Sequence, residues 1–561
     1  MNAPPILTCP AFGPSPSRLL IVGESPSADD VWKQRPFAGR SGDELSRMLH
    51  EAGILQTEAR QTYVLKSRIP SGDITALMES SRPKAVAKGL PHFWCGKWFG
   101  AEVAEGRESL VREIRETKPE VVLALGEAAL WALTGEVGIT SWRGSLLPLH
   151  PDLVAECECE PVIIPSYSPA SIQRSWDWRS ISVRDLKRAG DYLENPEQYQ
   201  YPAYSFAIRP TLPGVMQTLG SLLKDCQNGI PLRLSVDIET IARHIACVGI
   251  AWSSRDALCI PFMQQGAEPY WNLDEEIAIY ARLKALLTHP NCAVIGQNFN
   301  YDAQHFAKHL GYYPNLQFDT MLAQHTLFPG LPKSLDFISS MYAHYHRYWK
   351  DELDDYHKMP SDLETFWIYN CKDCVITWEC AGVLEAQIDL AGMREPFTFQ
   401  MKMARHVFNT MLRGVKIDQK KRSIVAGELL EAISVRESLI HQIAGELLNV
   451  GSPKQMKEFF YDSLSIPPIL HKKTKKPTID DDALAAIGRK NPLLLPLIEV
   501  IQEKRSLGVF LSTFCMMPLD TDGRMRTSYN IAGTETFRFN SSENAFGSGG
   551  NLQNIPKGEE K

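Results

Sequence analysis

Hydrophobic positions along this chain form short apolar runs, typical of strands, and longer periodic segments, typical of helices. Apolar runs that end in turn residues predict strands at 18–23, 119–126 and 162–166. Between the first two of these, segment 44–53 has helical periodicity and ends in a glycine, which predicts an amphipathic helix. Because strands and helices alternate over this region, we expect a sheet with helices packed on both faces.

Another largely apolar stretch, at residues 234–240, carries two carboxylates, Asp237 and Glu239. On a strand, side chains two positions apart point to the same face. Two acids on one face repel each other unless a positive charge lies between them, and a divalent metal ion often supplies that charge. Surface strands carry such pairs often, so the pair alone is a weak signal.

Two later segments strengthen this signal. An apolar run at 294–296 leads into a polar cluster that contains Asn298 and a third carboxylate, Asp302. Further on, Tyr369 and a fourth carboxylate, Asp373, are separated by one helical turn, which places both side chains on one helix face. The residues alone leave two interpretations open: a metal-dependent site, or four unrelated surface acids in an α/β domain.

In type, order and spacing, these three segments resemble the motifs of DnaQ-like 3′–5′ exonucleases, with the closest match in the proofreading domain of family A DNA polymerases. The resemblance implies a ribonuclease H-like fold and five catalytic residues: Asp237, Glu239, Asp302, Tyr369 and Asp373. In this family Asp237, Glu239 and Asp373 would hold two Mg²⁺ or Mn²⁺ ions, and Asp302 would assist mainly through water. Tyr369 would orient the attacking water, because a phenol is a directional partner.

Composition narrows the class of protein. A length of 561 residues suggests three or four domains, and a hydrophobic content of 44% is ordinary for globular proteins. No apolar run is long enough to span a membrane and no signal peptide is evident, so we expect no membrane partner. Twelve cysteines without a regular framework indicate reduced thiols in a cytoplasmic protein. The net charge is −7, but residues 401–561 sum to about +5, so phosphate contacts are expected there.

Four short motifs near the N-terminus resemble those of the uracil-DNA glycosylase superfamily, nearest to family 4 and to the glycosylase-like domains fused to some phage DNA polymerases. The motifs lie at four places: 23–26, 35–42, 125–126 and 165–169. The resemblance implies an α/β/α sandwich over residues 1–200, with a pocket formed by Glu24, Phe37 and Ser168. In active members the residue at the position of Phe37 stacks on a flipped base.

Three departures from that family argue against uracil excision. Ser168 stands where active members carry a histidine, and a hydroxyl cannot match that histidine in stabilising the departing base. No asparagine that could read the base edge occurs near residues 63–68. Ser67 replaces one of the four cysteines that hold an iron–sulfur cluster, although Cys9 and Cys95 could match two others. We therefore expect no cluster, and a domain that binds DNA or a partner without excising uracil.

The C-terminal part, residues 396–561, begins with periodic segment 421–448, which predicts a long helix, and continues to a lysine-rich loop at 471–476. Such a helix pair with a basic tip is either a solvated hairpin or a thumb that grips a duplex. Three later motifs, at 523–528, 533–542 and 551–556, resemble the thumb-to-palm entry of family A DNA polymerases.

The resemblances imply four DNA-binding residues, Asn298, Arg538, Gln553 and Asn554, and the basic loop adds Lys473 and Lys475 as candidates. Two features depart from the polymerase pattern. Phe537 replaces the family's usual glycine, and the spacer 543–550 is longer than usual.

These observations predict a multidomain α/β protein with a glycosylase-like domain at 1–200, an exonuclease domain at 206–395, and a mostly helical polymerase thumb with the start of a palm at 396–561. We expect the N-terminal portion of a replicative family A DNA polymerase from a bacterial or phage-infected cell. Its partners would be single-stranded and primer–template DNA. Because the chain stops at Lys561, before the polymerase catalytic aspartates, the rest would lie in a longer polymerase or a second chain. The alternatives are a uracil-excising repair enzyme and a non-catalytic DNA-binding or processivity module.

Overall fold

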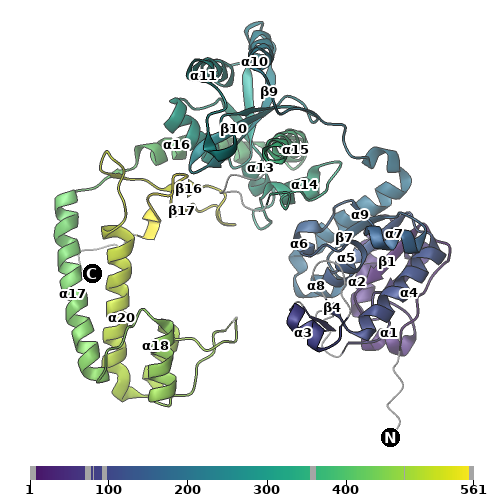
Figure 1. The fold of residues 1–561 in the computed structure, drawn as a ribbon, viewed down its shortest axis with the longest axis horizontal. Helices are drawn as coiled ribbons and strands as arrows, with labels where there is room; N and C mark the ends of the chain where they lie inside the picture. Colours follow the sequence, from purple (N-terminus) through teal and green to yellow (C-terminus); the bar gives the residue numbers. More distant parts are fainter. Residues whose placement is uncertain are drawn as a thin grey trace. The chain divides into compact units, whose positions relative to one another are not determined.

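The computed structural model describes residues 8–69, 77–79, 81–90, 98–353, 362–472 and 474–554. The chain divides into two compact units, Met1–Met401 and Lys402–Lys561. Within the first unit there are two large sheets, and each is covered by helices (Figure 1). Among the helices of the described ranges, none combines the length and the apolar character needed to cross a membrane.

The first sheet has five strands, in the order β2 (Arg60–Tyr63), β1 (Leu19–Gly23), β5 (Val121–Leu125), β7 (Val162–Ser166) and β6 (Leu147–Pro148). All neighbours are parallel except β6, which runs antiparallel to β7. A separate two-stranded ribbon pairs β3 (Met78–Glu79) with β4 (Trp98–Phe99). The helices of this region are α1 (Ala28–Lys33), α2 (Arg40–Glu51), α3 (Arg82–Ala87), α4 (Ala101–Thr117), α5 (Glu127–Thr134), α6 (Ile139–Trp142), α7 (Pro151–Cys157), α8 (Pro169–Arg174) and α9 (Arg179–Glu194), with short turns η1 (Gln56–Glu58), η3 (Trp176–Trp178) and η4 (Pro196–Tyr199).

Alternate residues of the central strands are buried on opposite faces of this sheet, as the period of a strand requires. Leu20 and Val22 of β1 pack into one hydrophobic cluster with residues of α4, α5 and α7. Leu19 and Ile21 of the same strand pack into another, with residues of α2, α8 and α9. The sheet is therefore covered on both faces, and the expected arrangement is confirmed.

The second sheet has six strands, in the order β13 (Leu316–Asp319), β12 (Cys292–Gly296), β9 (Leu232–Ile241), β10 (His244–Ala251), β11 (Asp256–Pro261) and β8 (Ser205–Ala207). Strand β9 runs parallel to β12 and antiparallel to β10. The helices here are α10 (Leu212–Gln227), η5 (Gln265–Ala267), α11 (Leu273–Leu287), α12 (Asn300–His305), η6 (Phe306–Leu310), α13 (Thr320–Leu327), α14 (Leu335–Tyr342), α15 (Leu363–Leu390) and α16 (Arg394–Arg413).

Helix α15 packs across β9, β10 and β11 because a glycine leaves room for it. Gly249 of β10 pairs with Asp237 of β9. A Cβ atom at Gly249 would lie 2.4 Å from Oδ1 of Asn370 and 2.7 Å from Sγ of Cys374, both on α15. Contacts below 3 Å are too close for carbon, so only glycine at this position permits the approach. The close packing brings Asp373 of α15 to the face of β9.

The second unit is mostly helical, with α17 (Gln419–Ala444), α18 (Pro453–Lys457), η7 (Glu458–Ser463), α19 (Asp481–Lys490), η8 (Pro492–Leu494), α20 (Leu495–Phe510) and η9 (Leu511–Cys515). Helices α17 and α20 pack side by side (Figure 1). The predicted helix at 421–448 is α17, and it ends at Ala444 because Gly445 takes a left-handed conformation with φ 74°. Two small ribbons pair β14 (Val415–Lys416) with β15 (Arg524–Met525) and β16 (Ser528–Asn530) with β17 (Asn540–Ser542), and η10 (Leu552–Asn554) follows.

Candidate active site

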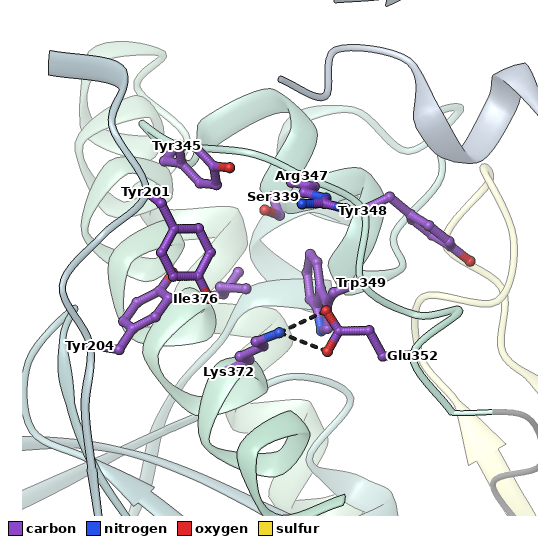
Figure 2. Close-up of a pocket in the computed structure, with 10 residues that line it drawn as sticks. All are labelled: Tyr201, Tyr204, Ser339, Tyr345, Arg347, Tyr348, Trp349, Glu352, Lys372 and Ile376. Carbon is purple, nitrogen blue, oxygen red and sulfur yellow. Dashed lines mark hydrogen bonds and ion pairs between the residues drawn. The ribbon is translucent and has the colours of Figure 1, made fainter. Parts of the chain in front are cut away.

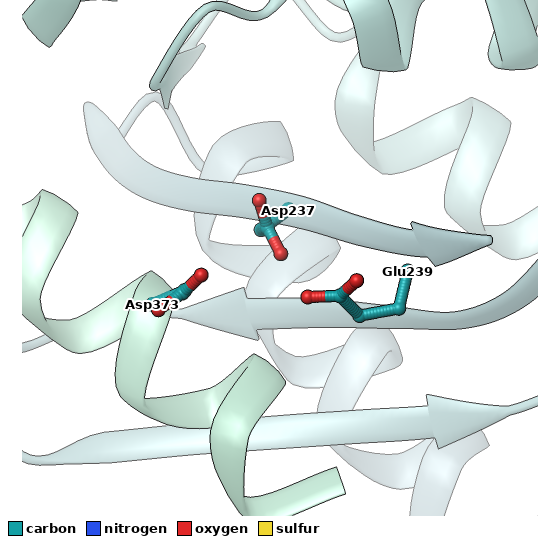
Figure 3. Close-up of side chains that lie close together, drawn as sticks. All are labelled: Asp237, Glu239 and Asp373. Atoms are coloured by element: carbon teal, nitrogen blue, oxygen red, sulfur yellow. The ribbon is translucent and has the colours of Figure 1, made fainter. Parts of the chain in front are cut away.

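Three carboxylates meet where α15 crosses β9. One ligand oxygen from each of Asp237, Glu239 and Asp373 lies within 4.8 Å of those of the other two (Figure 3). The two residues of β9 share a face because they are two positions apart on a strand. Asp373 joins them from the helix, through the close packing at Gly249. The structure thus brings together the three residues that the sequence resemblance assigns to the metal ions.

The fourth acid, Asp302, lies beside this cluster in the first turn of α12. Its Oδ1 accepts a hydrogen bond of 3.0 Å from the backbone N–H of Ile238, between the two acids of β9. That oxygen is already hydrogen-bonded to the backbone. Asp302 therefore lies beside the cluster of three carboxylates and is not a member of it. Asn298 is exposed and has φ 52°, and its N–H donates to Asp319. Asp319 is also the N-cap of α13, so it holds the Asn298 backbone to the start of that helix. The sequence did not predict this role.

Burial and mutual repulsion dominate the electrostatics of the four acids. Burial and the charge of Asp373 raise the pKa of Asp237 to about 8, against the opposing effects of Lys350 and Asn370. Burial and the two neighbouring acids hold the pKa of Glu239 well above its usual range. Burial likewise raises the pKa of Asp302. Ionised together, these groups need positive charge, and an all-carboxylate donor set suits a hard divalent cation.

Two residues that sequence reasoning missed complete the site. The ammonium Nζ of Lys350 donates to Oδ2 of Asp373 and to the hydroxyl of Tyr369, both at 2.6 Å. The indole Nε1 of Trp349 donates to Oδ1 of Asp373 at 2.7 Å. Burial disfavours the ammonium most strongly, but the charge and hydrogen bond of Asp373, together with the charges of Glu239 and Asp237, outweigh it and raise the pKa of Lys350. On the helix itself, Asn370 donates to Oδ2 of Asp237 at 2.9 Å.

A cavity of about 290 Å³ is lined in part by residues 345, 347, 348 and 349, which precede Lys350 (Figure 2). Its wall is mainly aromatic, and it includes Tyr201, Tyr204, Tyr345, Tyr348 and Trp349. Lys372 and Glu352 also line this cavity, and Lys372 donates to both oxygens of Glu352 at 2.7 Å. Trp349 lines the cavity (Figure 2) and also donates the hydrogen bond to Asp373.

The glycosylase-like region has a separate cavity of about 330 Å³, whose lining includes Glu24, Phe37 and Ser168. Tyr63 organises it: its hydroxyl donates to Asp30 at 2.9 Å and accepts from the N–H of Phe37 at 2.9 Å. The two aromatic rings pack with centroids 4.9 Å apart. The structure therefore gathers all three residues that the resemblance assigns to one pocket.

The polar groups of that cavity are bonded to the protein itself. Ser168 is the N-cap of α8, and its hydroxyl accepts from the N–H of Ser171 at 3.3 Å. Oε1 of Glu24 accepts from the N–H of Ala128 at 3.1 Å. Of the cysteines considered for a cluster, Cys9 is buried and Cys95 lies outside the described residues. The expectation that no iron–sulfur cluster forms stays a prediction.

In the second unit, Lys475, Arg538, Gln553 and Asn554 are exposed, whereas Lys473 lies outside the described residues. The side-chain Nε2 of Gln553 donates to the carbonyl of Phe539 at 3.0 Å, next to Arg538. Phe537, where the polymerase family has a glycine, has φ 59°. This left-handed conformation is the one that favours glycine, so phenylalanine adopts it at an energetic cost.

Comparison with known families matches three parts of the chain. Residues 10–189 match the uracil DNA glycosylase superfamily, residues 216–389 match the 3′–5′ exonuclease family and residues 420–561 match DNA polymerase family A. The chain therefore carries a uracil-DNA glycosylase-like domain, a 3′–5′ exonuclease domain and a family A DNA polymerase domain. The expected multidomain α/β class and the three resemblances are confirmed. The exonuclease domain implies a divalent metal ion, for which the three carboxylates are present.

The chain is also similar to individual DNA polymerases. The DNA polymerase of Bacillus phage SP01 is 20% identical over 620 residues, which cover 95% of this chain and 62% of that protein. DNA polymerase I of Pseudomonas aeruginosa is 24% identical, over 58% of this chain and 36% of the relative. The chain thus spans less than two thirds of these relatives' lengths. A solved structure, the POL domain of Pol1 from M. smegmatis in complex with DNA primer-template and dNTP, aligns with a TM-score of 0.45 and 19% identity, over 63% of this chain and 56% of that one.

Proposed function

We propose that this chain removes nucleotides from DNA 3′ ends in a metal-dependent reaction, as the proofreading part of a replicative family A DNA polymerase. One observation carries the proposal: Asp237, Glu239 and Asp373 converge within 4.8 Å on a domain of the 3′–5′ exonuclease family. In this function the chain works in the cytoplasm of a bacterial or phage-infected cell, where its DNA substrate lies.

The three carboxylates hold two divalent ions, Mg²⁺ or Mn²⁺, and Asp302 assists from beside them. When bound, such ions lower the pKa of an attacking water and stabilise the leaving 3′ oxygen of a phosphodiester. Tyr369 holds the attacking water through its hydroxyl, which Lys350 already orients at 2.6 Å. Asn298, exposed at the start of α12, contacts the strand that enters the site.

The other two domains supply DNA contacts. Arg538, Gln553, Asn554 and Lys475, with Lys473 of the same loop, bind the phosphates of primer–template DNA, and their exposure is consistent with that role. The glycosylase-like pocket holds a base or a strand without cutting it. Its Ser168 caps a helix and cannot stabilise a departing uracil anion as a histidine does.

A digestion assay tests the nuclease. The full chain, incubated in Mg²⁺ with a 5′-labelled single-stranded oligonucleotide, should produce a ladder of fragments shortened from the 3′ end. Asp237→Ala with Glu239→Ala should lower the rate by about a thousandfold or more, because the ligands of the metal ions are gone. Glu276→Ala, an acid on α11 away from the cluster, serves as the control. Undiminished digestion by the double variant would refute the assignment.

A further inference from the structure

A short segment links the glycosylase-like domain to the exonuclease centre within the first compact unit. We call residues 346–350, between α14 and α15, the connecting segment. At its start, the carbonyl of His346 accepts a hydrogen bond of 2.9 Å from the N–H of Leu146. Two residues on, the N–H of Tyr348 donates to the hydroxyl of Ser145 at 3.1 Å. Both partners belong to the region that matches the glycosylase superfamily.

The other end of the connecting segment reaches the metal-binding carboxylate. Trp349 donates to one oxygen of Asp373 and Lys350 to the other. Lys350 also donates to the hydroxyl of Tyr369, and its ammonium lies 4.6 Å from the centre of that ring. A carboxylate has about four lone-pair sites, so Asp373 can accept both hydrogen bonds and still bind a metal ion.

Buried charges fix the junction from which the connecting segment starts. Arg143 of the glycosylase-like domain is buried, pairs with the buried Asp185 and donates to the hydroxyl of Ser340 at 2.7 Å. The buried Arg188 donates to the carbonyl of Ala343 at 3.1 Å. Removing one partner from buried, hydrogen-bonded ions of this kind is strongly destabilising, because it leaves an uncompensated buried charge. The junction is therefore expected to persist while the protein is folded.

We propose that Lys350 is a positioning residue of the exonuclease centre, and that the glycosylase-like domain holds it there through Ser145 and Leu146. The inference rests on the proposed nuclease function. Lys350 occupies one lone pair of the Tyr369 hydroxyl, which fixes the rotation of that hydroxyl and leaves its proton and second lone pair for the attacking water. It also fixes Asp373 and sets one positive charge among four acids. On this account the glycosylase-like domain serves the exonuclease as a support.

The first experiment compares variants of the full chain on a single-stranded 3′ end in Mg²⁺. Lys350→Met keeps the aliphatic stem and should lower kcat by about 10- to 100-fold with little change in KM, because misplaced catalytic groups lose rate rather than substrate binding. Lys350→Arg should recover much of the loss. Lys372→Met is the matched control, since Lys372 pairs with Glu352 and does not reach the centre. A wild-type kcat for Lys350→Met, or an equal loss in the control, would overturn the proposal.

Two further readings separate positioning from a general structural role. By calorimetric titration, Lys350→Met should bind Mn²⁺ at least as tightly as the wild type, because a competing cation has been removed. Collapse of the site would instead weaken Mn²⁺ binding and kcat together. When Lys350→Met is combined with Tyr369→Phe, the loss in kcat should be smaller than the product of the two single losses, because both changes remove one interaction. Losses that multiply would show that Lys350 acts elsewhere.

The support role has its own variant. Ser145→Ala removes the acceptor of the Tyr348 N–H and should lower kcat about two- to fivefold, within the range of one lost hydrogen bond. Ser182→Ala is its control, a buried serine of α9 whose hydroxyl has no hydrogen-bond partner within the described ranges. A wild-type rate for Ser145→Ala would remove the glycosylase-like domain from the proposal. If the unmodified chain releases no nucleotides, the proposed function fails. If the unmodified chain is active and the variants match its rate, this inference alone fails.

Discussion

The exonuclease centre and the glycosylase-like pocket both keep the framework of their families, but they differ in how their polar groups are bonded. In the centre, four acids crowd together, and burial raises the pKa of Asp237, Glu239 and Asp302. In the pocket, Ser168 caps a helix and Tyr63 bonds to Asp30. Crowded acids with perturbed pKa values are typical of functional sites, and this excess of negative charge distinguishes the centre from the pocket.

Among the changes that leave the carboxylates in place, the largest effect is expected from disturbing the packing that assembles them. Gly249→Ala would place a Cβ atom 2.4 Å from Asn370 and push α15 away from β9. We expect the nuclease rate to fall about a hundredfold, because small displacements of catalytic groups cost that much. Gly382→Ala, on α15 itself, is the control, since a Cβ atom at Gly382 meets nothing within 4 Å. Equal activity of Gly249→Ala and the wild type would show that α15 does not set the site.

A pH titration of metal binding sharpens the electrostatic side of the comparison. Because the pKa of Asp237 is raised to about 8 without metal, this carboxyl is protonated at lower pH and must lose its proton to bind an ion. Mn²⁺ affinity should therefore rise with pH by up to about tenfold per unit and level off above pH 8. Calorimetry in buffers of different ionisation enthalpy measures both the affinity and the released proton. Affinity that is constant from pH 6 to 8 would contradict this picture.

The smallest effect is expected in the pocket. Ser168→His returns the donor that active glycosylases carry, but the asparagine that reads the base edge is still missing, and the N-cap of α8 is lost. We expect uracil excision to remain within about tenfold of background, since one donor alone is worth roughly a hundred- to a thousandfold only in an otherwise complete site. Ser171→His, three residues further along, controls for a misplaced histidine. Excision a hundredfold above background would show that the pocket lacks only this one group.

Local spacing was enough to predict the parts of the exonuclease centre that lie on regular elements. Asp237 and Glu239 share a face because of strand periodicity, and Tyr369 and Asp373 share one because of helix periodicity. Lys350 could not be predicted in this way. It lies in an irregular segment, and its contact with Asp373 depends on how α15 packs on the sheet. The capping role of Ser168 did carry a signal, since a serine directly before a proline is typical of a helix start.

The central claim is that this chain has a working exonuclease and a glycosylase fold that does not excise uracil. One single-stranded oligonucleotide, labelled at its 5′ end and carrying one internal uracil, tests both halves with the full chain. In EDTA, where metal-dependent cleavage is silent, the account predicts no abasic sites above background, and in Mg²⁺ it predicts release of nucleotides from the 3′ end. Abasic sites in EDTA, or an intact 3′ end in Mg²⁺, would each contradict it.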